Sequence, residues 1–203
     1  MSTATYQPKA DEIKKLRELT DAPMMDCKKA LVDAAGDIEK AKEELLKRGA
    51  AQAQKKAERV ANEGLVAGYI HAGGKIGVLV EVNSETDFVA RNPKFGELTR
   101  DLAMHIAAMS PQYVDRESVP PALVEQLRKD LAAAVPPGKP HEVAQKIVDG
   151  KLNKWYEEHC LLDQPFVKDD SISVGDLING VVGVLGEKIK VRRFTKYALG
   201  DPR

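Results

Sequence analysis

The sequence predicts an α+β protein, with a three-helix N-terminal bundle followed by a core of one three-stranded antiparallel sheet and about four helices. Two observations lead to this fold class. Apolar residues recur every three or four positions in residues 8–46 and again in residues 95–186, which is typical of helices. Residues 65–83 instead form two short β-prone runs around a glycine pair, which predicts a hairpin. A chain of 203 residues can bury a core in one or two small domains.

The N-terminal bundle, expected over residues 1–49, consists of three short helices separated by tight turns. The first helix begins near Pro8 and ends at Asp21-Ala22-Pro23, and Gly36 ends the second. Asp37 is a suitable N-cap for the third helix, because its carboxylate can accept the free N–H groups of the first turn. The apolar stripes of the three helices are Ile13, Leu16 and Leu19; Met24, Cys27, Leu31 and Ala34; and Ile38, Ala41, Leu45 and Leu46.

Residues 50–63 are rich in Ala, Lys and Gln and have little apolar stripe. Either the third helix continues past Gly49, or a new segment begins there. In both cases the segment buries few side chains. We therefore expect a helical tether that joins the bundle to a core domain of residues 64–203.

The core domain begins with the predicted hairpin. Strands over residues 65–71 and 75–83 flank Ala72-Gly73-Gly74, and glycine accepts the positive φ that tight turns require. Residues 189–197 alternate apolar and basic residues, and we expect them to return to the hairpin as the third strand. Four helices are predicted before this strand, over residues 95–109, 121–135, 140–160 and 173–186.

The second predicted strand is apolar on both faces. The residues on one face are Ile76, Val78, Val80 and Val82. Leu79 lies on the other face, and we expect Tyr69 and Tyr197 to join it. Helices can cover only one face, and the second is too apolar to leave fully wet. The sequence therefore predicts a homodimer, in which a second copy covers this face.

Composition excludes several classes of function. Lys+Arg and Asp+Glu both number 31, so no net charge draws the chain to a polyanion. The likeliest basic patch, Lys55-Lys56 with Arg59, is mixed with Glu58 and Glu63, which is typical of a solvated helix face. We therefore expect no direct nucleic-acid contact. No apolar run approaches the ~20 residues of a membrane span, and the N-terminus has no apolar signal core, so we expect a soluble cytoplasmic protein.

The two cysteines, Cys27 and Cys160, cannot form a disulfide framework, and we expect free thiols in a reducing compartment. His159 beside Cys160 is a poor zinc signal.

Residues 84–93 form the most informative segment, because they place an acid and an aromatic, Asp87 and Phe88, between a strand and a helix. From spacing alone, the favoured interpretation is that Phe88 packs under its own helix as a hydrophobic staple. The alternative is insertion into another molecule.

Several separated blocks of the chain resemble bacterial translation elongation factor Ts. They are the run from Gly64 through Asn92, Met24-Met25-Asp26-Cys27-Lys28-Lys29-Ala30-Leu31, Gly36-Asp37-Ile38-Glu39 and Gln164-Pro165-Phe166-Val167-Lys168-Asp169. They occur in the family's order and extend over nearly the whole chain. The resemblance implies that the N-terminal bundle is similar to a ubiquitin-associated domain. It also implies a short form with one core half, for which a second protomer supplies the other.

The resemblance implies a guanine-nucleotide exchange factor, which binds elongation factor Tu in its GDP-bound and nucleotide-free forms during translation elongation. The family's Thr-Asp-Phe-Val-Ala motif falls on Thr86, Asp87, Phe88, Val89 and Ala90. It implies that Asp87 and Phe88 enter the partner beside its Mg²⁺ site, which reverses the interpretation of Phe88 from spacing. Such a factor is not an enzyme with its own nucleophile, and it needs no cofactor or metal.

A second family contact is expected at Met24 and Met25. Packing of one of the two methionines inside the bundle is an equally good interpretation, since Met fills irregular gaps. Family members commonly have Gly-Ala-Gly before this pair, whereas this chain has Asp21-Ala22-Pro23. The turn before this contact is therefore stiffer and more acidic than in the family's pattern.

Two other classes of function compete with this one. An enzyme would have to use Cys160 with His159, or Asp87, but neighbouring helical residues point about 100° apart and are badly placed as nucleophile and base. A non-catalytic adaptor would use the N-terminal bundle to bind a protein partner.

His105, beside the stripe of the first core helix, is interpreted as a half-buried side chain with satisfied hydrogen bonds.

Overall fold

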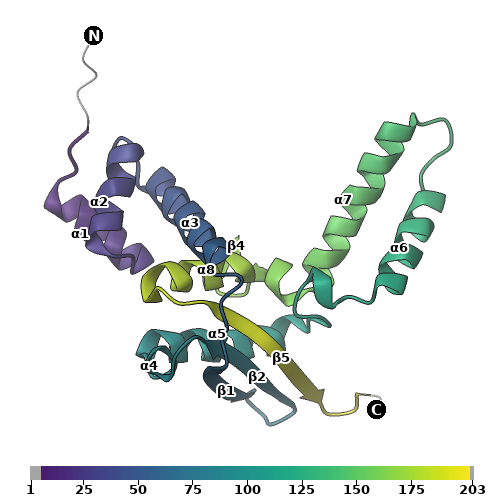
Figure 1. Cartoon of the computed structure of the whole chain (residues 1–203). Helices are drawn as coiled ribbons and strands as arrows, with labels where there is room; N and C mark the ends of the chain where they lie inside the picture. The colour runs from purple at the N-terminus through teal and green to yellow at the C-terminus, as the bar shows by residue number, and fades with distance from the viewer. Residues whose placement is uncertain (1–5, 202–203) are drawn as a thin grey trace. The chain divides into compact units, whose positions relative to one another are not determined.

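The structure is a computed structural model, and it describes residues 6–201. It confirms the predicted α+β class (Figure 1). The helices are α1 Ala10–Thr20, α2 Met24–Asp33, α3 Ile38–Lys55, α4 Asp87–Ala90, α5 Pro93–Met109, α6 Pro121–Ala133, α7 His141–His159 and α8 Val174–Leu185. The strands are β1 Glu63–Ile70, β2 Ile76–Ser84, β3 Pro165–Phe166, β4 Asp169–Ser173 and β5 Ile189–Ala198. Single 3₁₀ turns lie at Arg116–Ser118 and Leu161–Asp163.

Contacts divide the chain into two compact units. The first contains the residues up to Ala67 together with Glu81–Arg100 and Asp176–Val191. The second contains Gly68–Val80, Asp101–Gly175 and the chain from Arg192. The expected division into bundle, tether and core domain stays a prediction beside this division.

The N-terminal helices form the expected bundle. Asp37 is the N-cap of α3, and its carboxylate accepts hydrogen bonds from the backbone N–H groups of Glu39 and Lys40 at 3.1 and 3.2 Å. The bundle's core consists of Leu16, Ala22, Cys27, Ala30, Leu31 and Ala41, with Ile13, Ala34, Ile38 and Leu45 partly buried around it. Most residues of the predicted stripes therefore point inward. Leu19 and Met24 are exposed, and Leu46 is half-buried outside this core.

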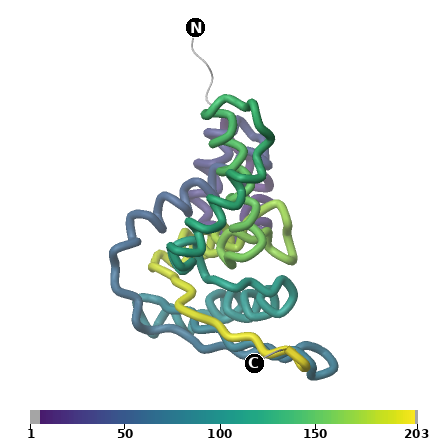
Figure 2. Tube along the Cα trace, turned by 90° about the vertical axis from the view of Figure 1, so that its right-hand side faces the viewer, coloured from purple at the N-terminus to yellow at the C-terminus, as the bar shows by residue number. Residues whose placement is uncertain are grey.

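Helix α3 continues past Gly49, which decides between the two alternatives for this segment. In Figures 1 and 2 it leads into the connection that reaches β1. Gly49 is buried because α8 passes against it: a Cβ built on Gly49 would lie 2.7 Å from the backbone oxygen of Asn179. The missing side chain at position 49 thus allows α3 and α8 to approach closely.

We expect Gly49→Ala to destabilise the protein by about 0.5–2 kcal/mol, because the overpacking cost of ~1–3 kcal/mol exceeds the ~0.5–1 kcal/mol that alanine gains over glycine in a helix. Gly150→Ala in α7 is the matched control, since nothing lies within 4 Å of its added Cβ. This control should stabilise the protein by about 0.5–1 kcal/mol. Chemical denaturation of both variants measures the free energies of unfolding. If both substitutions change this free energy in the same direction, the close contact of α3 with α8 is contradicted.

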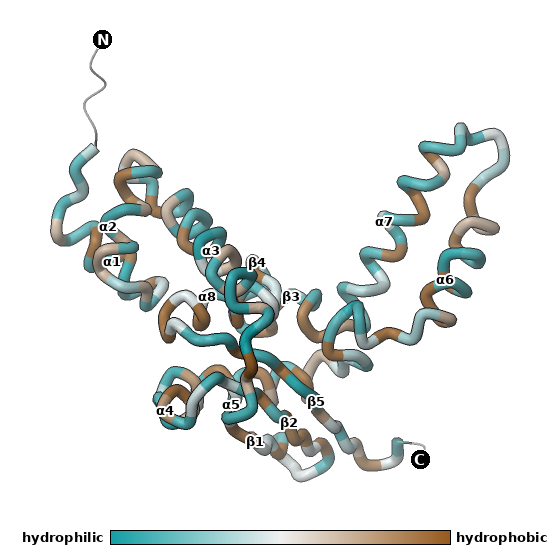
Figure 3. The backbone as a smooth tube through the Cα atoms, viewed as in Figure 1, coloured by the Kyte–Doolittle hydropathy of each residue, from teal (hydrophilic) through white to brown (hydrophobic). Residues whose placement is uncertain are grey.

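The hairpin and the last strand form the expected sheet, in the order β1-β2-β5. Brown, hydrophobic residues mark the hairpin in Figure 3. In β2 the side chains of Val78, Val80 and Val82 are buried and Leu79 is exposed, as the alternation predicts. A one-residue shift in register would exchange these faces, so the valines fix how β2 is oriented.

Two expected positions are wrong in detail. Tyr69 does not join Leu79: it lines a hollow of about 520 Å³ with Ile76 of β2 and Met104 of α5, so it lies on the helix-covered face. The reason is the strand period of two, which places Ile70 of β1, and not Tyr69, on the face of Leu79. Met109 is the second: the helical period of residues 95–109 places it on one stripe with Phe95, Leu98, Leu102 and Ile106, but it is 42% exposed because α5 ends there.

The segment around Pro165 forms a small second sheet, β3-β4, which the sequence did not predict. His105 of α5 anchors it. The His105 Nδ1 accepts the backbone N–H of Val167 at 3.2 Å, and Nε2 lies 3.0 Å from Gln164 Oε1 and donates to it. Burial lowers the pKa of the His105 imidazole, although the hydrogen bond to Gln164 opposes this effect. His105 is thus a neutral, fully buried structural residue. It binds Gln164 and stacks on the ring of Phe166.

Candidate functional site

The site lies where β2 ends and α4 begins. Thr86 is the N-cap of α4, and its Oγ1 accepts the backbone N–H of Val89 at 3.4 Å. Ser84 before the turn and Val89 and Ala90 after it are buried. Buried residues on both sides therefore hold a short exposed segment, Thr86 to Phe88, at the end of the strand.

Phe88 points away from its own chain. Its side chain is 81% exposed, so it is not a hydrophobic staple under α4 or α5. A phenylalanine contributes about 1.5–3 kcal/mol when it moves from water into an apolar site. Its exposure leaves this free energy available for a partner. Val89, in contrast, is only 6% exposed and packs within this chain.

Asp87 makes one surface ion pair. Its Oδ2 lies 2.8 Å from Arg91 Nη2, four residues further on, and both side chains are largely exposed. Such a pair contributes about 0–1 kcal/mol at most, because water solvates both charges well. The carboxylate can therefore exchange Arg91 for another polar partner at little cost.

The predicted bundle contact is also exposed. Met24 and Met25 begin α2, and their exposed fractions are 58% and 72%. Neither methionine fills the bundle core, which decides against the alternative interpretation of this pair. We call this exposed pair at the start of α2 the methionine patch.

The turn before the methionine patch explains the departure from the family's glycine. Asp21 has φ = 53°, in the left-handed region that favours glycine, and its N–H donates to the carbonyl of Arg17 at 2.7 Å as the C-cap of α1. Aspartate tolerates this conformation better than most residues. Asp21 Oδ2 also lies 2.5 Å from Lys94 Nζ, near the start of α5. A glycine could not make this ion pair.

The thiols and histidines do not form a nucleophilic site. Burial, followed by the negative charge of Asp163, raises the pKa of the Cys160 thiol to about 11. Burial also raises the pKa of Cys27. Thiols with such pKa values are protonated at neutral pH and react poorly. The His159 ring is stacked on Trp155, and its Nδ1 is 2.8 Å from the Trp155 carbonyl, so it is held by its own helix.

Neither a metal-binding cluster nor a membrane-spanning helix accompanies the turn in the part of the chain that the structure describes. Within residues 6–201, no group of three or more His, Cys, Asp or Glu residues is arranged to hold a metal ion. Over the same range, none of the helices has both the length and the apolar character to cross a membrane. The exposed features within these residues include the β2–α4 turn, the methionine patch and the outer face of the sheet.

Sequence reasoning missed the residues that hold the turn in place. The Glu187 carboxylate accepts the backbone N–H of Thr86 at the β2–α4 turn, and the Glu85 carboxylate accepts the backbone N–H of Lys188 at the connection from α8 to β5. Position 187 is 101 residues away from Thr86, and a lone glutamate between a glycine and a lysine carries no recognisable pattern. Only the fold brings these groups together.

Comparisons with known proteins agree with the blocks noted in the sequence. A family model described as "Elongation factor TS" matches residues 3–201. An elongation factor Ts of Koribacter versatilis is 57% identical over 195 residues, which cover 95% of this chain and 88% of that protein. Those of Moorella thermoacetica and Alkaliphilus oremlandii are 54% and 53% identical over 193 residues. These matches cover 95% of this chain, and 95% and 89% of the two relatives.

Proposed function

The chain belongs to the elongation factor Ts family, whose members are nucleotide exchange factors for elongation factor Tu, and on this premise we propose how it acts. It binds elongation factor Tu and promotes GDP release by disturbing the Mg²⁺ site of that GTPase. Phe88 enters the partner between helices, and Asp87 disturbs the groups that hold the metal. The observation that carries this proposal is the exposed Phe88 at a turn with buried residues on both sides.

The proposed mechanism is thermodynamic linkage. The chain binds the nucleotide-free partner more tightly than the GDP-bound partner, so by reciprocity its binding weakens GDP. No covalent step by this chain is needed. Thr86 and Val89 belong to the proposed contact in different ways, since Thr86 is exposed and Val89 supports the turn from within.

The turn alone cannot supply the whole effect. Moving a two-state site from nearly closed to nearly open requires roughly 5.5 kcal/mol of preference for one state. One phenylalanine contributes about 1.5–3 kcal/mol. We therefore assign the remainder to a wider interface of about 1,200–2,000 Å², which includes Met24 and Met25. Their exposure supports this assignment.

The direct test is GDP release from purified elongation factor Tu loaded with a fluorescent GDP. Release is followed with and without this chain, with excess unlabelled nucleotide present. We expect catalytic amounts of the chain to accelerate release, with the rate rising to saturation. No acceleration at concentrations above that of the GTPase would refute the proposed function. If acceleration occurs but is the same at all Mg²⁺ concentrations, the metal part of the proposal fails.

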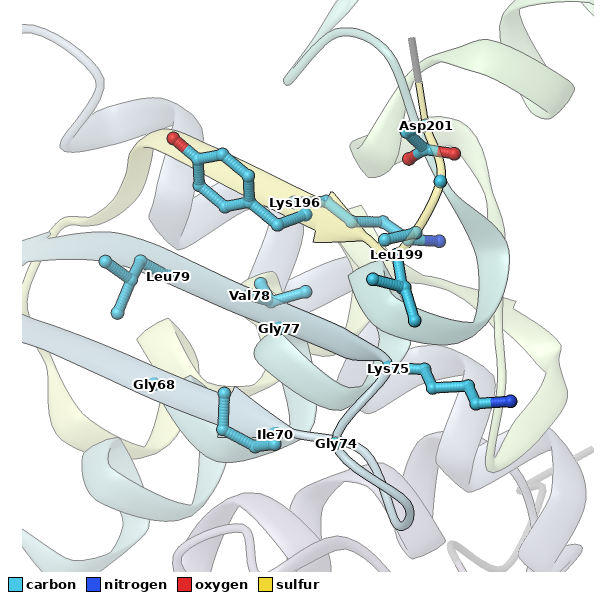
Figure 4. A pocket seen from close by; sticks show the side chains of 13 residues that line it. Gly68, Ile70, Gly74, Lys75, Gly77, Val78, Leu79, Lys196, Leu199 and Asp201 are labelled. Atoms are coloured by element: carbon cyan, nitrogen blue, oxygen red, sulfur yellow. The ribbon is translucent and has the colours of Figure 1, made fainter. Parts of the chain in front are cut away.

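We also propose that the exchange-active form is a homodimer joined through the outer face of the sheet. This face is a broad hollow of about 1130 Å³, and its apolar side chains include Ile70, Leu79, Tyr197 and Leu199. All four are exposed in the single chain. Figure 4 shows Ile70, Leu79 and Leu199 bordering this hollow. A second copy of the same face would remove this apolar surface from water.

We expect Leu79→Lys to weaken the dimer by at least about tenfold, because it places an unpaired charge in an apolar interface. Leu79 is exposed in the single chain, so the monomer should stay folded. Val143→Lys on α7 makes the same change at another exposed apolar residue and should leave assembly unchanged. Sedimentation at micromolar concentrations measures the dissociation constant. A wild-type protein that sediments as a clean monomer would refute the dimer.

A further inference from the structure

Two connections that are distant in sequence are joined by a reciprocal pair of carboxylates. Glu187, after α8, accepts the backbone N–H of Thr86 at 3.0 Å through Oε2 and the hydroxyl of Thr86 at 2.7 Å through Oε1. Glu85, beside Thr86, accepts the backbone N–H of Lys188 at 2.6 Å. Each connection therefore supplies one carboxylate and one backbone donor to the other. We call these four residues, 85, 86, 187 and 188, the carboxylate clamp.

The segment that precedes β1 binds the side chains of Glu85 and Lys188 in the clamp. Arg59 Nη1 lies 3.3 Å from Glu85 Oε2, and Lys188 Nζ donates to the backbone oxygens of Ala57 and Arg59. The backbone N–H of Lys188 lowers the pKa of Glu85, and Arg59 adds to this effect against desolvation. Glu85 is thus ionised at neutral pH, as the bonds require.

Thr86 connects the clamp to the start of α4, the helix that carries Phe88. The Thr86 hydroxyl donates to Glu187 and also accepts the N–H of Val89, so a single rotamer serves both the clamp and the N-cap of α4. Ser84 Oγ donates to the Thr86 backbone oxygen at 2.9 Å. Backbone and side chain of Thr86 are therefore held on both sides, two residues before Phe88. None of these bonds involves the exposed ring itself.

We propose that Glu187 is a positioning residue, which holds the β2–α4 turn in the conformation that presents Phe88 to the partner. This inference rests on the proposed exchange function. A turn that is already in its bound conformation loses less conformational freedom when the partner binds. If the turn populates the competent conformation only in part, the apparent affinity falls by that fraction. The bound complex itself is the same whether or not the turn was held before binding.

This reasoning predicts a separation of KM from kcat. In Glu187→Gln the isosteric amide keeps one acceptor oxygen and loses the charge and the second acceptor. We expect KM for the GDP-loaded partner to rise about three- to tenfold, with kcat unchanged within a factor of about two. Glu142→Gln on α7 makes the same charge change elsewhere and should alter neither constant. Glu187→Asp, which keeps both acceptors on a shorter arm, should recover part of the loss.

A second measurement does not depend on exchange activity. Amide hydrogen exchange followed by NMR reports on the Thr86 N–H, which Glu187 binds, and on the Lys188 N–H, which Glu85 binds. In Glu187→Gln we expect Thr86 to exchange at least about fivefold faster, while amides in the middle of β2 keep their rates. Unchanged melting temperatures would show that the fold is intact.

The outcomes are distinguishable. If wild-type protein does not accelerate GDP release, the proposed function fails, and the Thr86 amide alone decides whether Glu187 holds the turn. If wild type is active and the variant loses kcat at constant KM, Glu187 acts in the exchange step and the positioning role is overturned. It is also overturned if Thr86 keeps its protection, or if faster amide exchange leaves KM unchanged.

Discussion

Phe88→Ala is expected to lower kcat/KM for GDP release from elongation factor Tu by about 10- to 150-fold, with little change in the stability of the chain. The range follows from the ~1.5–3 kcal/mol that a buried phenylalanine contributes, at about 1.4 kcal/mol for each factor of ten. Stability should be unaffected because the side chain is exposed and supports no core. Stopped-flow release of fluorescent GDP measures the effect, and thermal unfolding checks the fold.

The control for this variant is Val143→Ala, which shortens an exposed apolar side chain on α7. It should leave kcat/KM within a factor of about two of wild type. It also matters whether the loss in kcat/KM comes from kcat or from KM. A fall in kcat would place Phe88 in the displacement of GDP, whereas a rise in KM alone would make it a docking contact. Equal exchange by wild type and Phe88→Ala would remove Phe88 from the site and leave the fold assignment intact.

The largest effect on folding is expected for Gly64→Ala. Gly64 in β1 has φ = 142°, a backbone conformation that side chains rarely adopt. A Cβ built there would lie 2.1 Å from the Val82 backbone oxygen and 2.7 Å from Asn83 Cα. The substitution therefore combines backbone strain of ~1–3 kcal/mol with overpacking of ~1–3 kcal/mol, and we expect a total loss of about 2–6 kcal/mol.

Gly68→Ala is the control for Gly64→Ala, since it makes the same change in the same strand. Its added Cβ would lie 3.4 Å from Leu79 Cδ2, an ordinary contact with a side chain, and its φ is not unusual for an L-residue. We expect a change of less than about 1 kcal/mol. Urea denaturation of the two variants gives the comparison. If both lose the same free energy, the close approach of β1 and β2 at Gly64 is not a determinant of stability.

Local patterns predicted most of the fold. The N-cap at Asp37, the glycine pair in the hairpin and the valines of β2 each specify a local geometry that tertiary contacts did not override. The sequence could not show the β3-β4 sheet, because its strands are short and depend on His105, about 60 residues earlier, for an anchor. The expectation that Tyr69 joins Leu79 was wrong because the alternation of β1 places the neighbouring residue, Ile70, on that face.

The site was predictable only in part. The positions of Asp87 and Phe88 follow from a contiguous motif, but spacing alone favoured a ring packed against its own helix. What keeps the ring exposed is the buried pair Ser84 and Val89 on either side, together with the clamp through Glu187. Those bonds connect positions about a hundred residues apart, and no local pattern of charge predicts them. The contact roles of Thr86, Asp87, Phe88, Val89, Met24 and Met25 remain predictions.

The two hidden thiols give this chain a built-in pair of reporters. Cys27 is in the first unit and Cys160 in the second, and both are completely enclosed. A small alkylating reagent can modify either sulfur only during an excursion that uncovers it. The mass of each labelled peptide, followed over time, therefore reports separately on opening around each thiol, without any engineered label.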